Sequence, residues 1–233
     1  MDSTERRYAI ILGHNRVDDL RETIQGIIGQ VDRVWVHDNA SSPPLYDLLK
    51  PEFLEVIFLR DSEQPPNLSR YWNVSLDQVH MFHYAYGANV AMPAPAYKVA
   101  VLTDDLIIPD GWFDAVSEGM DRTGAAAGCT SGFKDRLTQH ILKTHPDSDV
   151  ANRPFGPAFI LRGDANIRAD ERLRWWYGDT DVDWKARAAG GMVTMPGPYV
   201  HNKHPNESTV GVNAEQAGRD REMFKEIWGG VPW

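Results

Sequence analysis

The stretch at residues 97–112 most constrains the fold, because an apolar run within it stops abruptly at two adjacent acids. Residues 99–102 are wholly apolar, as in a short strand that a sheet buries on both faces, and Thr103, Asp104 and Asp105 follow directly. In an open α/β sheet, the carboxyl end of such a strand faces the ligand crevice. Two interpretations stay open here: a carboxylate pair that binds a divalent cation, and a solvated turn in which one acid caps the next helix.

Short apolar runs alternate with amphipathic segments along the rest of the chain. Strands are predicted over residues 8–12, 33–37, 54–59, 99–102, 125–130 and 192–195, with a further strand leading up to Arg162. Helices are predicted over residues 17–28, 68–83, 112–122, 179–190 and 214–228, whereas residues 131–153 carry no clear period and are expected to form a mobile loop region. This order predicts an α/β fold with a mainly parallel central sheet flanked by helices.

The composition narrows the class of protein. The chain has 233 residues and a net charge of −9 at pH 7, which disfavours strong non-specific binding to nucleic acid. Cys129 is the only cysteine, so it has no partner for an intrachain disulfide or a cysteine-cluster metal site. Because the sequence shows neither a signal-peptide core nor an apolar stretch of membrane-spanning length, we expect a cytoplasmic protein with no membrane partner.

Four segments, in the same order, resemble the family-2-like glycosyltransferases with the GT-A fold. The first is Asn15-Arg16, between a strand and an amphipathic helix, and the second is the strand end Asp38-Asn39-Ala40-Ser41. The third is Thr103-Asp104-Asp105, in place of the family's DxD motif. The fourth runs from Gly156 through Asp179-Thr180-Asp181 to Arg187 and Gly190, and is followed by His201 and Ser208. Two positions depart from the family pattern: Thr103 stands where DxD begins with Asp, and Gly178 stands where many relatives carry Glu.

The resemblance implies a GT-A (Rossmann-like) catalytic domain over residues 1–233, with a nucleotide-binding half at about 1–110 and an acceptor-binding half at about 111–233. It implies that Asp38 hydrogen-bonds the nucleobase and that Asp104 contacts the ribose. The residues implied to hold the donor nucleotide are Leu12, Gly13, His14, Asn15, Arg16, Asp38, Asn39, Arg70, Asn73, Thr103 and Asp104. Without the resemblance, Asp38 is equally read as the cap of a turn.

The same resemblance assigns the metal and the chemistry. Asp105 would bind a divalent cation, Mn²⁺ or Mg²⁺, that bridges the donor diphosphate, and His201 would add a metal or phosphate contact. Asp179 resembles the general base of an inverting transfer, with Asp181 as its rival. The alternative is that these acids and Asp183 only form the acidic first turn of a helix and a solvated face, with Arg187 at the surface.

The predicted function is therefore transfer of a sugar from a UDP-, GDP- or dTDP-linked donor to an acceptor hydroxyl on a glycan, a protein, a small molecule or a modified base. One alternative is a nucleotidyltransferase of related α/β architecture. That class typically has a glycine-rich phosphate loop, and the turn from Gly13 to Arg16 lacks the further glycines. The other alternative is a non-catalytic protein that binds sugar nucleotides.

Overall fold

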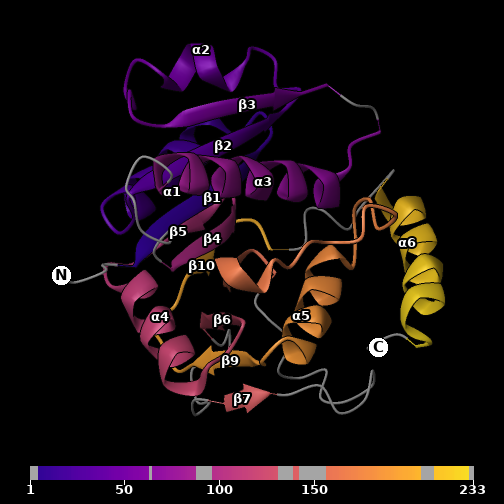
Figure 1. Ribbon diagram of the computed structural model, residues 1–233. Helices are drawn as coiled ribbons and strands as arrows, with labels where there is room; N and C mark the ends of the chain where they lie inside the picture. Colours follow the sequence, from indigo (N-terminus) through magenta and orange to yellow (C-terminus); the bar gives the residue numbers. More distant parts are fainter. Residues whose placement is uncertain are drawn as a thin grey trace.

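The computed structural model describes residues 5–62, 65–87, 96–130, 139–141, 156–205 and 213–230 (Figure 1). Its strands are β1 (Arg6–Gly13), β2 (Arg33–Asn39), β3 (Ile57–Asp61), β4 (Tyr97–Thr103), β5 (Leu106–Ile107), β6 (Ala127–Thr130), β7 (Gln139–Ile141), β8 (Ala158–Arg162), β9 (Met192–Met195) and β10 (His201–Asn202). Its helices are α1 (Val17–Ile28), α2 (Leu45–Leu49), α3 (Leu68–Gly87), α4 (Trp112–Thr123), α5 (Gly178–Ala188) and α6 (Asn213–Trp228), with a 3-10 turn, η2, at Gly163–Ala165.

Eight strands form one sheet in the order β3-β2-β1-β4-β8-β6-β9-β7, and β5 pairs with β10 in a separate two-stranded sheet. The first four strands of that order are parallel, β8 is antiparallel to both of its neighbours, and β6 and β9 are again parallel. The chain moves outward from β1 to β3 and then returns to β4 on the other side of β1. This reversal of direction creates a switch point between β1 and β4, where α/β sheets bind ligands.

Helices cover both faces of the sheet, which explains why its central strands are apolar on both sides. One buried cluster joins the sheet to α1, α2 and α4, and a second joins its other face to α3 and α5. Figure 1 shows α4 and α5 on either side of β6 and β9, with α6 beyond α5. Aromatic residues of α5 and α6, Trp184 and Phe224 among them, form a third cluster that fixes the last helix. No helix in the described ranges is long and apolar enough to cross a membrane.

The predicted mainly parallel α/β architecture is confirmed, with local differences. The third strand occupies 57–61 rather than 54–59, because Leu54 lies in the preceding turn and is 74% exposed. Helix α2 and the strand pair β5–β10 were not predicted, and α3 continues to Gly87. Within residues 131–153, only 139–141 are described, and they form β7; the rest of that segment and Ser208 lie outside the described residues.

Candidate functional site

The polar residues singled out in the sequence follow three neighbouring strands. In the parallel register, Gly13 of β1 lies beside Asp38 of β2, and Leu12 lies beside Thr103 of β4. The carboxyl ends of β1, β2 and β4 therefore meet at one edge of the sheet. The turn after β1 and the acids after β4 face each other there, at the switch point between the two strands.

The turn after β1 is tied to both neighbouring strand ends. The backbone N–H of His14 donates to Asp104 Oδ2 at 2.8 Å, and His14 Nδ1 lies 2.6 Å from the carbonyl oxygen of Asn39. Asn15 has a left-handed φ of 60°, a conformation that asparagine tolerates better than most residues. Its backbone N–H donates to Ser41 Oγ at 2.9 Å, and its Oδ1 accepts from the backbone N–H of Ser42 at 2.9 Å. These bonds fix the turn against the ends of β2 and β4.

The acidic pair is buried, with residue exposures of 7% for Asp104 and 4% for Asp105. Thr103 Oγ1 donates to Asp105 Oδ1 at 2.7 Å, which leaves Asp105 Oδ2 directed at the Arg16 guanidinium, 3.1 Å away. The same Arg16 nitrogen lies 3.7 Å from Asp104 Oδ1. Burial raises the pKa of the Asp104 carboxyl to about 6, against the opposing effects of the His14 N–H and the Arg16 charge. Two ionised carboxylates in this position need a nearby cation.

The end of β2 places two hydrogen-bond acceptors beside the site: the Asp38 carboxylate, which has partners, and Asn39 Oδ1, which has none among the described residues. The carboxylate of Asp38 accepts from the backbone N–H of Ser41 at 2.8 Å, from that of Leu45 at 3.1 Å and from Arg60 at 3.1 Å. Asp38 thus caps the turn into α2, as the alternative interpretation expected. Asn39 is 6% exposed, and its Oδ1 has no hydrogen-bond partner among the described residues. A buried acceptor without a partner is a position where a ligand donor is favoured.

The two residues of α3 that were predicted to hold the donor nucleotide, Arg70 and Asn73, have different environments. Arg70 lies in the first turn of α3 with a side chain that is 43% exposed, and it lies 3.7 Å from Asp61, the last residue of β3. Asn73 is buried, and its amide forms a two-way bond with the backbone of Ala169: the Ala169 N–H donates to Oδ1 and Nδ2 donates to the Ala169 carbonyl, both at 2.9 Å. Asn73 therefore holds the segment before α5 against α3, a structural contact that the sequence did not reveal.

Asp179 lies beside the residues that lead into β8, next to the end of β4. The backbone N–H of Thr103 donates to the carbonyl of Pro157 at 3.0 Å, and the preceding residue, Gly156, packs against the Asp179 carboxylate. A Cβ at position 156 would lie 2.4 Å from Asp179 Oδ2, so any other residue there would require the carboxylate to shift. Asp179 is half-buried, in the first turn of α5. Asp179 is thus linked to the end of β4 through Gly156 and Pro157.

The two neighbouring acids of α5 do not share that environment. Asp181 is fully buried and accepts from the Asp170 backbone N–H at 2.8 Å, from Lys185 at 2.7 Å and from Trp228 Nε1 at 2.9 Å. Asp183 is also buried, and its carboxylate pairs with Arg187 through bonds of 2.8 and 2.6 Å. The solvated-face interpretation is therefore wrong for Asp181, Asp183 and Arg187.

His201 lies on the small β5–β10 sheet. Its backbone is opposite Ile107, and the next turn is joined to the acidic motif by a bond of 2.9 Å from the Lys203 N–H to the Asp105 carbonyl. Lys203 also pairs with Asp19 and Glu22 of α1. The His201 side chain is exposed, and the described residues contain no group of three or more His, Cys, Asp or Glu side chains placed to hold a metal ion. A closed metal centre made by the described side chains alone is thus not formed.

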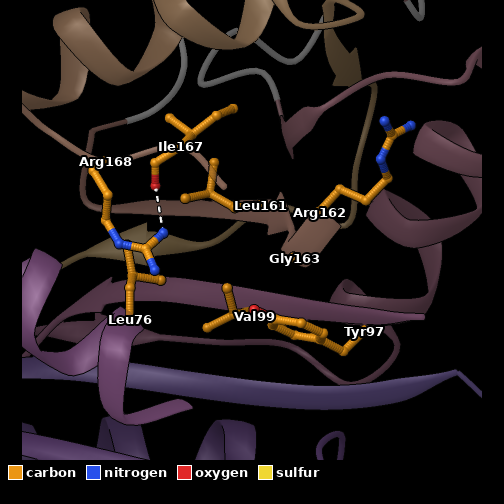
Figure 2. A pocket seen from close by; sticks show the side chains of 8 residues that line it. All are labelled: Leu76, Tyr97, Val99, Leu161, Arg162, Gly163, Ile167 and Arg168. Carbon is orange, nitrogen blue, oxygen red and sulfur yellow. Dashed lines mark hydrogen bonds between the residues drawn. The ribbon is translucent and has the colours of Figure 1, made fainter. Parts of the chain in front are cut away.

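A small pocket lies away from this edge, on the α3 side of β4 and β8 (Figure 2). Its volume of about 10 Å³ is room for roughly one water molecule, so it cannot hold a nucleotide. The Tyr97 ring fills the space beside Gly163, where a Cβ would lie 2.2 Å from a ring carbon. The lining residues are Leu76, Tyr97, Val99, Leu161, Arg162, Gly163, Ile167 and Arg168. None of them is among the predicted site residues.

Solved structures of Staphylococcus aureus TarS share this architecture. The structure of TarS residues 1–349 aligns over 96% of this chain and 72% of its own length, with a TM-score of 0.60 and 12% identity. The complex of that fragment with UDP-GlcNAc aligns over 95% and 66%, with a TM-score of 0.60 and 14% identity. A longer TarS structure is covered to only 43% of its length, with a TM-score of 0.61. No protein-family model and no curated protein sequence matches the chain. At these identities the likeness establishes the fold alone, and the chain has the GT-A glycosyltransferase fold of TarS.

Proposed function

We propose that this chain is a glycosyltransferase that moves a sugar from a nucleotide-sugar donor to an acceptor hydroxyl. The observation that carries the proposal is the meeting of three segments at one sheet edge: the turn after β1, the acidic pair after β4, and Asp179 behind Gly156. TarS, which has the same fold, has been crystallised with UDP-GlcNAc and with UDP. Among the UDP-, GDP- and dTDP-linked donors, a UDP-linked sugar is therefore the first to test.

The nucleotide would lie across the carboxyl ends of β1 and β2. Main-chain groups from Leu12 to Asn15 would hold the base and ribose, and Asp104 would contact the ribose. Asn39 supplies a buried Oδ1 without a partner among the described residues, which suits an N–H donor of a nucleobase. Asp38 already accepts three hydrogen bonds, so we expect it to shape the base pocket through the turn that it caps.

The acidic pair fits a divalent cation of the Mg²⁺ or Mn²⁺ type. Such ions take hard oxygen donors and are commonly held by one or two carboxylates, with waters and substrate phosphates as the other ligands. Asp105, supported by Thr103, and the adjacent Asp104 provide two buried carboxylates of this kind. When bound there, the cation would neutralise charge on the departing nucleoside diphosphate. His201 remains a candidate for an additional contact.

Asp179 is the proposed general base. It would accept the proton of the acceptor hydroxyl while that oxygen attacks the anomeric carbon, and the diphosphate would leave from the opposite face with inversion. Asp181 is unsuited to this role, because both of its oxygens already accept hydrogen bonds inside the protein. Gly156 keeps the space in which the Asp179 carboxylate sits.

The nucleotide and cation parts of the proposal are tested by one binding experiment. Thermal shifts with UDP, GDP and dTDP, with and without Mn²⁺, should show stabilisation by one nucleotide that increases with metal, because ligands that bind the folded state raise its stability. Asp105→Asn should remove the metal-dependent part of that shift. Asp110→Asn, the same change at an exposed acid nearby, is the matched control. An Asp105→Asn protein that keeps the full Mn²⁺-dependent shift would remove Asp105 from the cation site.

A second test addresses the space beside Asp179. Gly156→Ala places a methyl group within 2.4 Å of Asp179 Oδ2, so the carboxylate must move. Because a displacement of about 1 Å can reduce catalysis by about 10²-fold, we expect a loss of transfer of that order with donor affinity unchanged. Gly218→Ala in α6, where a Cβ meets nothing within 4 Å, is the control. Full activity in Gly156→Ala would show that the position of Asp179 is not critical.

A further inference from the structure

A positively charged side chain, that of Arg16, already lies against the acidic pair. Arg16 Nη1 lies 3.1 Å from Asp105 Oδ2 and 3.7 Å from Asp104 Oδ1, and this nitrogen is the group that bridges the two carboxylates. The other oxygen of Asp105 already accepts a hydrogen bond from Thr103, so Oδ2 is the oxygen that we assign to a metal ion. A guanidinium and a divalent cation cannot share that position, because both are positive and both require the same lone pairs.

We propose that Arg16 is the resident counter-ion of the acidic pair, and that a divalent cation binds to Asp105 only by displacing the Arg16 guanidinium. The inference rests on the proposed function, which identifies the pair as the cation site. It goes further in making Arg16 a competitor of the metal. In the donor-free protein, the Arg16 guanidinium occupies the position of the metal ion and weakens metal binding.

The position of Arg16 permits this exchange. Arg16 precedes the first turn of α1 with non-helical dihedral angles, φ −94° and ψ 67°, and its side chain is 34% exposed. Its backbone carbonyl accepts from the Leu20 N–H at 2.9 Å, a bond that does not involve the side chain. The guanidinium can therefore swing toward solvent without unwinding the helix or opening the core.

The exchange links metal binding to donor binding. A donor diphosphate brings negative charge to the same edge of the sheet and offers the released guanidinium a new partner, in the bidentate geometry that arginine forms with phosphate. Without the nucleotide, displacement breaks the contacts of Arg16 with Asp105 and Asp104 and supplies no phosphate in exchange. We therefore expect Mn²⁺ to bind weakly to the free protein and more tightly in the presence of the nucleoside diphosphate.

Titration of Mn²⁺ into the nucleotide-free protein, followed by the loss of the free-ion paramagnetic resonance signal, tests the proposal. Arg16→Gln should bind Mn²⁺ about tenfold more tightly than wild type or better, because it removes a positive charge a few ångströms from the ion. Arg16→Lys should remain near wild type. Arg21→Gln is the matched control: it makes the same charge change five residues further along the chain, within α1, at a residue paired with Asp18 and Glu52 instead.

Three results would overturn the inference: equal Mn²⁺ affinity in Arg16→Gln and Arg21→Gln, weaker binding in Arg16→Gln, or no binding in any variant. UDP should also raise the Mn²⁺ affinity of wild type by a larger factor than that of Arg16→Gln, since the variant has no guanidinium to displace. Calorimetry of nucleotide binding to wild type separates this inference from the proposed function. If wild type binds no nucleotide but Arg16→Gln still binds Mn²⁺ more tightly than wild type, the proposed function is contradicted and the counter-ion role of Arg16 stands.

Discussion

Asp179→Asn should lose about 10²–10⁴-fold in transfer rate and bind the nucleotide donor as tightly as wild type. A general base typically contributes a factor of that size to the reaction and little to substrate affinity. The amide keeps the shape of the carboxylate and one hydrogen-bonding oxygen, but it cannot accept the proton of the acceptor hydroxyl. The half-buried position of Asp179, beside a glycine that leaves room for its carboxylate, makes a large rearrangement in the variant unnecessary.

The measurement is a pair of assays on the same protein, single-turnover transfer and equilibrium binding of the donor. If donor affinity falls as much as the rate, Asp179 contributes to binding and is not the base. If both are unchanged, the base is elsewhere. Slow hydrolysis of the donor by water is expected to persist in the variant, since water can lose its proton to solvent. Hydrolysis by wild type would also exclude a protein that only binds sugar nucleotides.

Much of the nucleotide-side fold was accessible from sequence because periodicity determines it. Residues 8–12 and 99–102 are apolar without alternation, and the structure buries both faces of β1 and β4. What sequence could not give was the direction of β8. Its residues are also buried on both faces, and an apolar run of this kind fits a parallel or an antiparallel neighbour equally well. Helix α2 was not predicted because its five residues, which follow two prolines, are too few to show a helical periodicity.

The candidate site was predicted in part, and its limits have a physical cause. Strand-end acids were found because an apolar run that stops at charged residues is a local signal. The partners of those acids are set by contacts between distant residues, such as Arg16 with Asp105, 89 positions apart. Likewise, three acids within five residues of α5 look alike in sequence. Only the arrangement of Lys185, Arg187 and Trp228 makes Asp181 and Asp183 structural and leaves Asp179 beside Gly156.

Asp181→Asn, the same substitution two residues further along the helix, should affect stability instead of chemistry. Asp181 accepts three hydrogen bonds, two at Oδ2 and one at Oδ1, with no exposure to solvent. An asparagine has one oxygen for these donors, so its NH₂ group must face at least one N–H, and the charge that pairs with Lys185 is lost. Leaving buried donors unsatisfied in this way costs about 2–4 kcal/mol of folding free energy. The lost pairing with Lys185 contributes the smaller part of this cost, because the Lys185 side chain is partly exposed to solvent.

For a chain of this size, that loss lowers the melting temperature by roughly 5–15 °C, measurable by calorimetry on the unliganded protein. Trp228 belongs to the aromatic cluster that joins α6 to α5, so urea should release the C-terminal helix at a lower concentration in the variant, which tryptophan fluorescence reports. At temperatures where Asp181→Asn is folded, its transfer rate should stay within a few fold of wild type, and Asp179→Asn should melt near wild type. The opposite pattern, a stable and inactive Asp181→Asn beside an active Asp179→Asn, would move the base two residues along the helix, against the hydrogen bonds that now occupy both oxygens of Asp181.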